Sequence, residues 1–187
     1  MTTSLRRGFK AEAEWLAKDV RKDLGLAFYK PICPIALAER CGLAVQPLSE
    51  YHVEHPLEVL RLRAATGPKG FSAVTVCGPE GGLVIYNDGH APTRQAADIA
   101  HECAHALLHH KPQPLVGTNG ARHYDKVCED EANWLGPALL VSYDAAFAIV
   151  RAGEAVDDAA GRFGVSASLM GMRIRVTGVR RRVSYAA

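Results

Sequence analysis

The chain has 187 residues, of which 48% are hydrophobic and 22% are charged. This length and composition predict a soluble globular protein of about one domain with a small appendage, and they exclude collagen, coiled coils and extensive disorder. Lys and Arg number 22 against 20 for Asp and Glu, so the net charge of +2 gives no argument for a nucleic-acid or membrane partner.

The first half of the chain predicts two helices followed by a small sheet. Apolar residues at three- and four-residue steps predict an amphipathic helix over residues 5–24, and Pro34 opens a short second helix that ends near Cys41. Branched residues between Gly and Pro clusters then predict strands. We expect residues 43–87 to form a small, mostly antiparallel sheet with strands over residues 43–48, 59–62, 71–76 and 83–86.

The second half predicts helices. Thr93 is the expected N-cap of a helix that runs to about His110, and an exposed loop follows from Lys111 to Tyr124. The next helix should span residues 125–140, with a kink at Pro137. The remaining predicted features are a helix over residues 142–151, two short helices within residues 153–178 joined at residues 164–166, and an exposed basic tail at residues 180–182. We therefore expect a catalytic region of residues 1–141 and a C-terminal helical region of residues 142–187.

One motif in the helix after the predicted sheet carries chemistry. His101 and His105 are four residues apart in a His-Glu-Cys-Ala-His segment, so a helix presents both imidazoles on one face, where both can bind one metal ion. Glu102 lies beside the first of these histidines and can accept a proton from a water that attacks a carbonyl. Cys103, inside the motif, is expected to be a small buried residue.

A hydrolytic zinc site needs a third protein ligand, and the next helix offers acidic residues for it. Glu129 lies beside the apolar stripe of that helix and is the expected ligand, whereas Glu131 is the alternative and is expected to face solvent. Asn133, one turn after Glu129, is expected to orient His101 or His105 through the free ring N–H.

Other polar residues near the motif have weaker patterns. Tyr124 and His123, with Arg122 as a further candidate, could donate to the oxyanion of a tetrahedral intermediate. His109 is four residues after His105 and should share its helix face, where an interaction with the helix dipole is favoured over substrate binding.

With these motifs the chain resembles the ImmA/IrrE family of metallo-endopeptidases, which are gluzincin-like zinc proteases. Four segments carry the resemblance: residues 34–45, the motif of residues 99–105, residues 129–133, and residues 163–173. The resemblance implies His101, His105 and Glu129 as metal ligands and Glu102 as the catalytic base. The family usually has a Phe-Ala-Ala run after the Asn, where this chain has residues 134–137 with the sequence Trp-Leu-Gly-Pro.

The sequence and the resemblance together predict an α+β zinc endopeptidase that hydrolyses a peptide bond by metal-activated water, with Mn²⁺ as an alternative metal. By resemblance, the substrate would be a helix-turn-helix transcriptional repressor, cleaved to relieve repression. The spacing of residues 155–178 is itself helix-turn-helix-like, with nearby arginines at positions 173, 175 and 180–182. The alternatives are therefore a DNA-binding regulator, or a toxin–antitoxin component, with a structural or inactive metal site.

The compartment follows from what the sequence lacks. No apolar stretch reaches the roughly 20 residues of a membrane span, and charged residues interrupt the place of a signal peptide's apolar region. The five cysteines form no CxxC pair and are odd in number. We expect a cytoplasmic protein with reduced thiols and no membrane partner.

Overall fold

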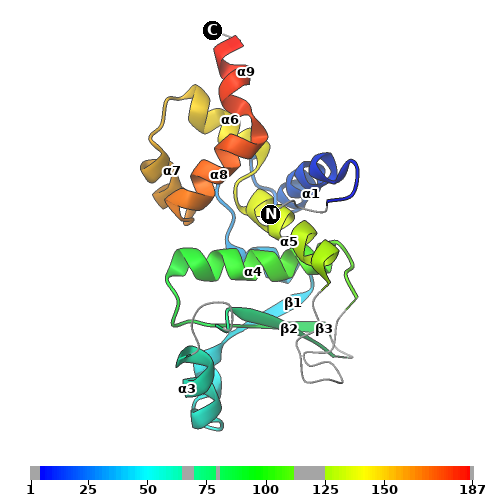
Figure 1. Cartoon of the computed structure of the whole chain (residues 1–187), viewed down its shortest axis with the longest axis vertical. Coiled ribbons are helices and arrows are strands. Elements are labelled where there is room, and N and C mark those ends of the chain that lie inside the picture. The colour runs from blue at the N-terminus through cyan, green and yellow to red at the C-terminus, as the bar shows by residue number, and fades with distance from the viewer. Residues whose placement is uncertain (1–4, 65–69, 79–80, 112–124, 186–187) are drawn as a thin grey trace.

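The computed structural model describes residues 5–64, 70–78, 81–111 and 125–185. Within these ranges the protein is α+β, with helices arranged around one three-stranded mixed sheet (Figure 1). The elements are α1 (Phe9–Asp23), α2 (Pro34–Arg40), β1 (Leu43–Pro47), the 3-10 helix η1 (Leu48–Tyr51), α3 (Pro56–Ala64), β2 (Ala73–Gly78), β3 (Gly81–Tyr86), α4 (Pro92–Leu107), α5 (Lys126–Leu140), α6 (Tyr143–Arg151), α7 (Val156–Phe163), α8 (Ala167–Thr177) and α9 (Val179–Tyr185).

The strand order is β1–β3–β2, so β3 is the central strand. β2 and β3 form the expected antiparallel hairpin, with Thr75 opposite Val84, but β1 runs parallel to β3, with Val45 opposite Val84. The prediction of a mostly antiparallel sheet is therefore wrong for β1. The hairpin signal is local to residues 73–86, whereas β1 and β3 are far apart in the sequence, so no local signal gives the direction of β1 relative to β3.

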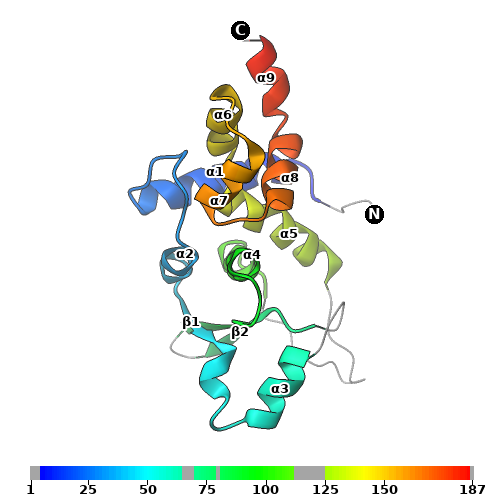
Figure 2. The same cartoon turned by 90° about the vertical axis from the view of Figure 1, so that its left-hand side faces the viewer.

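The strand predicted at residues 59–62 is wrong, because this segment lies inside helix α3. Pro56 begins the helix, where its fixed φ and missing N–H are tolerated. The following Leu and Arg residues favour a helix, and Val59 is the one residue of α3 buried in the core. α3 projects from the rest of the molecule at the side of the sheet away from α4 (Figures 1 and 2).

Helix α4 occupies the middle of the fold. It packs on β2 and β3 on one side and against α2 and α5 on others (Figure 2). Its buried side chains are small or branched: Ala96, Ile99, Ala100, Cys103 and Ala104. Cys103 is fully buried, as expected, and its thiol lies within hydrogen-bond reach of Cys41.

The ends of the central helices differ in detail from the prediction. α4 begins at Pro92 with Ala91 as its N-cap, not Thr93, because proline is favoured at the first helical position. α4 also ends at Leu107 rather than His110. α5 begins as predicted, with the Asp125 carboxylate accepting from the backbone N–H of Val127 and Cys128, and it continues through Pro137 to Leu140.

Helices α6 to α9 follow α5 and pack together above it (Figure 1). The two short helices predicted within residues 153–178 are confirmed as α7 and α8, and Gly164, in the left-handed region, ends α7. Buried side chains on both sides of residue 141 belong to one continuous core cluster. The domain boundary at residue 141 stays a prediction. Among the described residues, no single helix is long and apolar enough to cross a membrane; only α5 and α6 taken together, bent by 49°, have that length and composition.

Two buried arginines hold the C-terminal end of α5. Arg21 of α1 donates to the carbonyl of Leu140 at 2.9 Å, and Arg173 of α8 donates to the carbonyl of Val141 at 2.8 Å. Arg173 is 1% exposed and also pairs with Glu14 of α1 at 2.5 Å. Burial and the neighbouring Arg173 lower the pKa of Arg21 to about 10. These contacts join α1, α5 and α8 through groups that α5 could not satisfy alone.

The Glu14→Ala variant should lose about 2–3 kcal/mol of unfolding free energy, because it leaves the Arg173 guanidinium buried without its carboxylate. Chemical denaturation would measure the loss. Asp23→Ala on the same helix is the matched control, since it removes the exposed ion pair with Arg40 and should change stability by less than about 1 kcal/mol. Equal effects of the two substitutions would contradict the role given to Glu14.

Candidate metal centre

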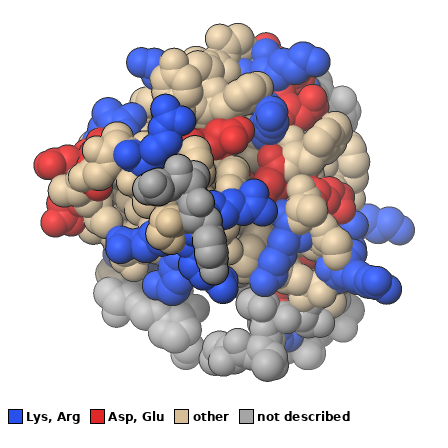
Figure 3. All heavy atoms as spheres, turned by 90° about the horizontal axis from the view of Figure 1, so that it is seen from above, with Lys and Arg blue, Asp and Glu red and all other residues tan. Residues whose placement is uncertain are grey.

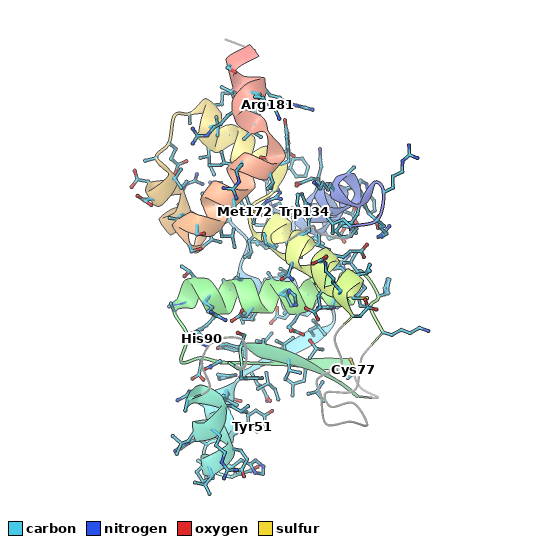
Figure 4. All side chains as sticks on the ribbon, viewed as in Figure 1. Tyr51, Cys77, His90, Trp134, Met172 and Arg181 are labelled. Atoms are coloured by element: carbon cyan, nitrogen blue, oxygen red, sulfur yellow. The ribbon has the colours of Figure 1, made fainter. Side chains whose placement is uncertain are left out.

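Three potential metal ligands converge between α4 and α5. The Nε2 atoms of His101 and His105 are 3.1 Å apart, and the Glu129 carboxylate lies 3.4 Å from His101 Nε2 and 3.7 Å from His105 Nε2. One ligand atom from each residue lies within 4.8 Å of the other two. Figure 4 shows side chains of α4 and α5 meeting where the helices face each other, on the Cys77 side of the view and away from His90.

This donor set fits a divalent metal. Ligand atoms bound tetrahedrally at about 2.0–2.1 Å from a zinc ion lie about 3.3 Å from one another. The two imidazole nitrogens are 3.1 Å apart, and each lies 3.4 or 3.7 Å from an oxygen of the Glu129 carboxylate, Oε2 for His101 and Oε1 for His105. These distances are close to that value, and one ligand atom from each residue lies within 4.8 Å of the other two. Two imidazoles and one carboxylate are also a known ligand combination of catalytic zinc sites, in which the fourth position stays open.

The spacing of the two histidines explains part of this geometry. The i, i+4 step places His101 and His105 one turn apart on α4. Gly136 of α5 then allows the helices to approach closely, because a Cβ atom there would lie 3.2 Å from the backbone N and Cα of His101. Gly136 belongs to the Trp-Leu-Gly-Pro segment that replaces the family's usual Phe-Ala-Ala run. This difference from the family thus falls where α5 touches the backbone of His101.

The surroundings of the two imidazoles shift their pKa values in opposite directions. Burial disfavours protonation of His101, but its hydrogen bond to Glu129 and the nearby charge of Glu102 outweigh burial and raise its pKa. Burial and the adjacent His101 lower the pKa of His105 to about 4. Because two imidazolium ions would repel each other strongly at this distance, at least one imidazole stays neutral and available as a ligand.

Glu102 is held by the sheet. Its carboxylate accepts a hydrogen bond of 2.5 Å from the Thr75 hydroxyl on β2. The strand therefore sets the orientation of the side chain beside His101. The role of Thr75 cannot be read from the sequence, since it depends on the packing of β2 under α4, and a threonine within a predicted strand carries no such signal.

A second set of polar side chains lies behind His105. His110 Nδ1 is 2.9 Å from His105 Nδ1, and His110 Nε2 is 3.4 Å from Glu131, which also accepts from Arg6 at 2.9 Å. The expectation that Glu131 faces solvent is therefore wrong: its side chain is 7% exposed. It is buried because residues before α1 and after α4 cover this side of α5, which helical phase cannot reveal.

The backbone turn after α4 places His110. Its N–H donates to the carbonyl of His105, and the N–H of His109 donates to Ala106, which is the Schellman pattern of a helix C-terminus. His109 occupies the left-handed position of this motif with φ of 51°, which is normally taken by glycine. His109 is thus exposed beyond the helix rather than on the face of His105 as predicted.

The remaining predicted site residues are not part of this cluster. Asn133 is exposed, and no hydrogen bond between described residues joins it to either imidazole, so its orienting role stays a prediction. Tyr124, His123 and Arg122, with most of the predicted loop at residues 111–124, lie outside the described residues. A groove of about 650 Å³ near the N-terminal end of α4, lined by Tyr86 and Phe163 among others, contains none of the three converging donors.

Comparison with known proteins agrees with this site. The family model of the IrrE N-terminal-like domain, Peptidase_M78, matches residues 54–175. This segment contains α4 with the two histidines, α5 with Glu129, and most of α8. The match defines a class of metal-dependent peptidases. The chain belongs to the Peptidase_M78 family, the ImmA/IrrE family that the sequence motifs indicated. Searches of curated proteins and of solved structures gave no significant match.

His109→Gly should stabilise the protein by about 0.5–1 kcal/mol, because relief of the left-handed strain exceeds the added entropy of the unfolded chain. Thermal unfolding of the two proteins would measure it. His52→Gly is the matched control, since His52 has φ of −64° and gains nothing from glycine. A destabilised His109→Gly protein would contradict this account of the turn.

Proposed function

We propose that this protein is a zinc-dependent endopeptidase in which His101, His105 and Glu129 bind the metal and Glu102 is the general base. The observation that carries the proposal is the convergence of the three donors beside a carboxylate that Thr75 holds in place. Family membership supports the peptidase chemistry. Zinc is preferred because two imidazoles and one carboxylate suit it, with Mn²⁺ as the alternative.

The bound metal would supply Lewis acidity, which polarises the scissile carbonyl and lowers the pKa of water. The chain's own residues then manage the proton. Glu102 accepts a proton from the attacking water and delivers it to the amine nitrogen that leaves, and its hydrogen bond from Thr75 keeps one carboxylate oxygen occupied. Tyr124 and His123 remain our candidates for donors to the oxyanion.

The sheet offers a place for the peptide. β2 is an edge strand in the order β1–β3–β2, and Thr75 on this strand contacts Glu102. An extended peptide that pairs with the outer edge of β2, which no other described strand occupies, would run past the base and the metal ligands. This arrangement favours cleavage within a chain, because a peptide strand can extend in both directions along the edge, and it is the reason we propose an endopeptidase.

We propose that the substrate is a cytoplasmic helix-turn-helix repressor whose cleavage relieves repression. This part of the proposal rests on the family resemblance. The presence of a small repressor gene beside this one would support it.

DNA binding by the C-terminal helices is the weaker hypothesis. Arg173, counted in the sequence among the local positive charges, is buried against Glu14 and Val141 and is not available to a phosphate. Figure 3 looks down on this end of the molecule and shows Lys and Arg side chains interspersed with Asp and Glu rather than one uniform basic face. A DNA-binding surface normally has clustered basic residues.

Glu102→Gln should lower kcat by about 10²–10⁴-fold while zinc stays bound, because the amide cannot accept the proton but the three ligands are intact. Cleavage of a fluorescence-quenched peptide library, with zinc content measured by atomic absorption, would test both parts. Glu58→Gln on exposed α3 is the control and should retain full activity. A Glu102→Gln protein that cleaves at the wild-type rate would contradict the assignment of the base.

Thr75→Val should lower kcat by about tenfold and leave KM and zinc affinity close to wild type, because it removes the hydrogen bond that orients Glu102 but keeps the side-chain shape. Steady-state kinetics on the same peptides would separate kcat from KM. Thr177→Val, the same substitution on α8, is the control. Unchanged kcat in Thr75→Val would show that the sheet does not position the base.

A further inference from the structure

Two largely buried side chains outside the proposed ligand set are arranged to act on the metal centre through His105. His110 follows α4, Glu131 belongs to α5, and their side chains are 10% and 7% exposed. His110 Nδ1 lies 2.9 Å from His105 Nδ1, and His110 Nε2 lies 3.4 Å from Glu131 Oε2. The two histidine rings meet edge to face, with centroids 5.0 Å apart.

We propose that His110 and Glu131 are positioning residues that hold His105 in the orientation and tautomer needed to bind the metal; this inference rests on the proposed function. His105 Nε2 faces His101 at 3.1 Å and Glu129 at 3.7 Å, so Nε2 is the atom that binds the metal. The ring proton of a neutral His105 is then on Nδ1, on the side of His110.

This placement determines every proton in the chain of contacts. His105 Nδ1–H donates, so His110 Nδ1 accepts and carries no proton. The ring proton of neutral His110 is therefore on Nε2, where it donates to the Glu131 carboxylate. Such hydrogen bonds behind a histidine ligand fix its ring orientation and make it a better ligand.

Glu131 is well placed to end this chain of hydrogen bonds. Its other carboxylate oxygen accepts from Arg6 Nε at 2.9 Å, and Arg6 also pairs with Glu12 of α1. A cation therefore faces the carboxylate on the side away from His110. Because Glu129 and Glu131 belong to the same helix, α5 would supply both a ligand and the support for another ligand.

The backbone gives independent evidence that the position of His110 is fixed relative to His105. The Schellman turn needs a left-handed residue, and His109 adopts that conformation although it has a side chain. The turn brings the N–H of His110 to the carbonyl of His105 at 3.0 Å. His110 is thus held to His105 through both its backbone and its ring.

The test measures zinc affinity of the full chain by competition with a chromogenic chelator. His110→Phe keeps a ring but loses both hydrogen bonds, and it should weaken zinc binding by about 10–100-fold. His110→Asn keeps an acceptor near the position of Nδ1 and should recover part of that loss. His109→Asn is the matched control, since asparagine tolerates the left-handed region, and it should bind zinc as the wild type does.

Long-range ¹H–¹⁵N NMR of the zinc-loaded wild type gives a second readout, the tautomers of His105 and His110. A purely structural role of His110 would not determine these tautomers. We expect His110 as the Nε2–H tautomer and the Nδ1–H proton of His105 protected from exchange; in His110→Asn that proton should stay detectable. If His110 carries its proton on Nδ1, the inference is overturned even where His110→Phe does not fold.

The outcomes also separate this inference from the proposed function. Wild-type zinc affinity in a folded His110→Phe protein would overturn the positioning role and leave the peptidase proposal standing. A wild-type chain that binds no zinc would overturn the peptidase proposal and this inference with it. Weakened binding in His110→Phe with partial recovery in His110→Asn would support both.

Discussion

The close packing of α5 on α4 is the constraint on which the rest of the structure depends. The two helices touch at Gly136, where any side chain would press on the backbone of His101 at 3.2 Å. The short distance brings the first turn of α5, with Glu129, to the face of α4 that carries both histidines. A ligand set made from two helices is only as well defined as the distance between them, because side-chain rotamers cannot compensate for a shift of a full ångström.

The sheet and the segment before α1 then act on the two sides of this helix pair. β2 lies under α4 and orients Glu102 through Thr75. On the opposite flank, Arg6 and His110 enclose Glu131. The polar groups at the centre are therefore each supported by an element other than their own. Partly buried polar groups need such partners, since an unsatisfied group there costs free energy comparable to a lost hydrogen bond.

The parts of the site that could be predicted from the sequence are those set by periodicity within one element. The i, i+4 histidines follow from the pitch of a helix, and Glu129 follows from the apolar stripe of α5. His110 and Glu131 could not be predicted, because one depends on a left-handed turn at a non-glycine residue and the other on burial by a distant segment. The fold divides in the same way between local and long-range features. The β2–β3 hairpin can be predicted because its signal is local, whereas the parallel pairing of β1 and the helical state of α3 cannot.

One structural role of the C-terminal helices is to hold the C-terminal end of α5. Helix α5 carries Glu129 in its first turn, and at its other end the carbonyls of its last residue, Leu140, and of its C-cap, Val141, are bound by Arg21 and Arg173. Because α8 supplies Arg173 and α1 supplies both Arg21 and Glu14, these helices hold the orientation of α5 from the end opposite Glu129. An arginine that the sequence suggests for binding DNA is thus used inside the protein, where a rotation of α5 would break its hydrogen bonds and move Glu129 away from the two histidines.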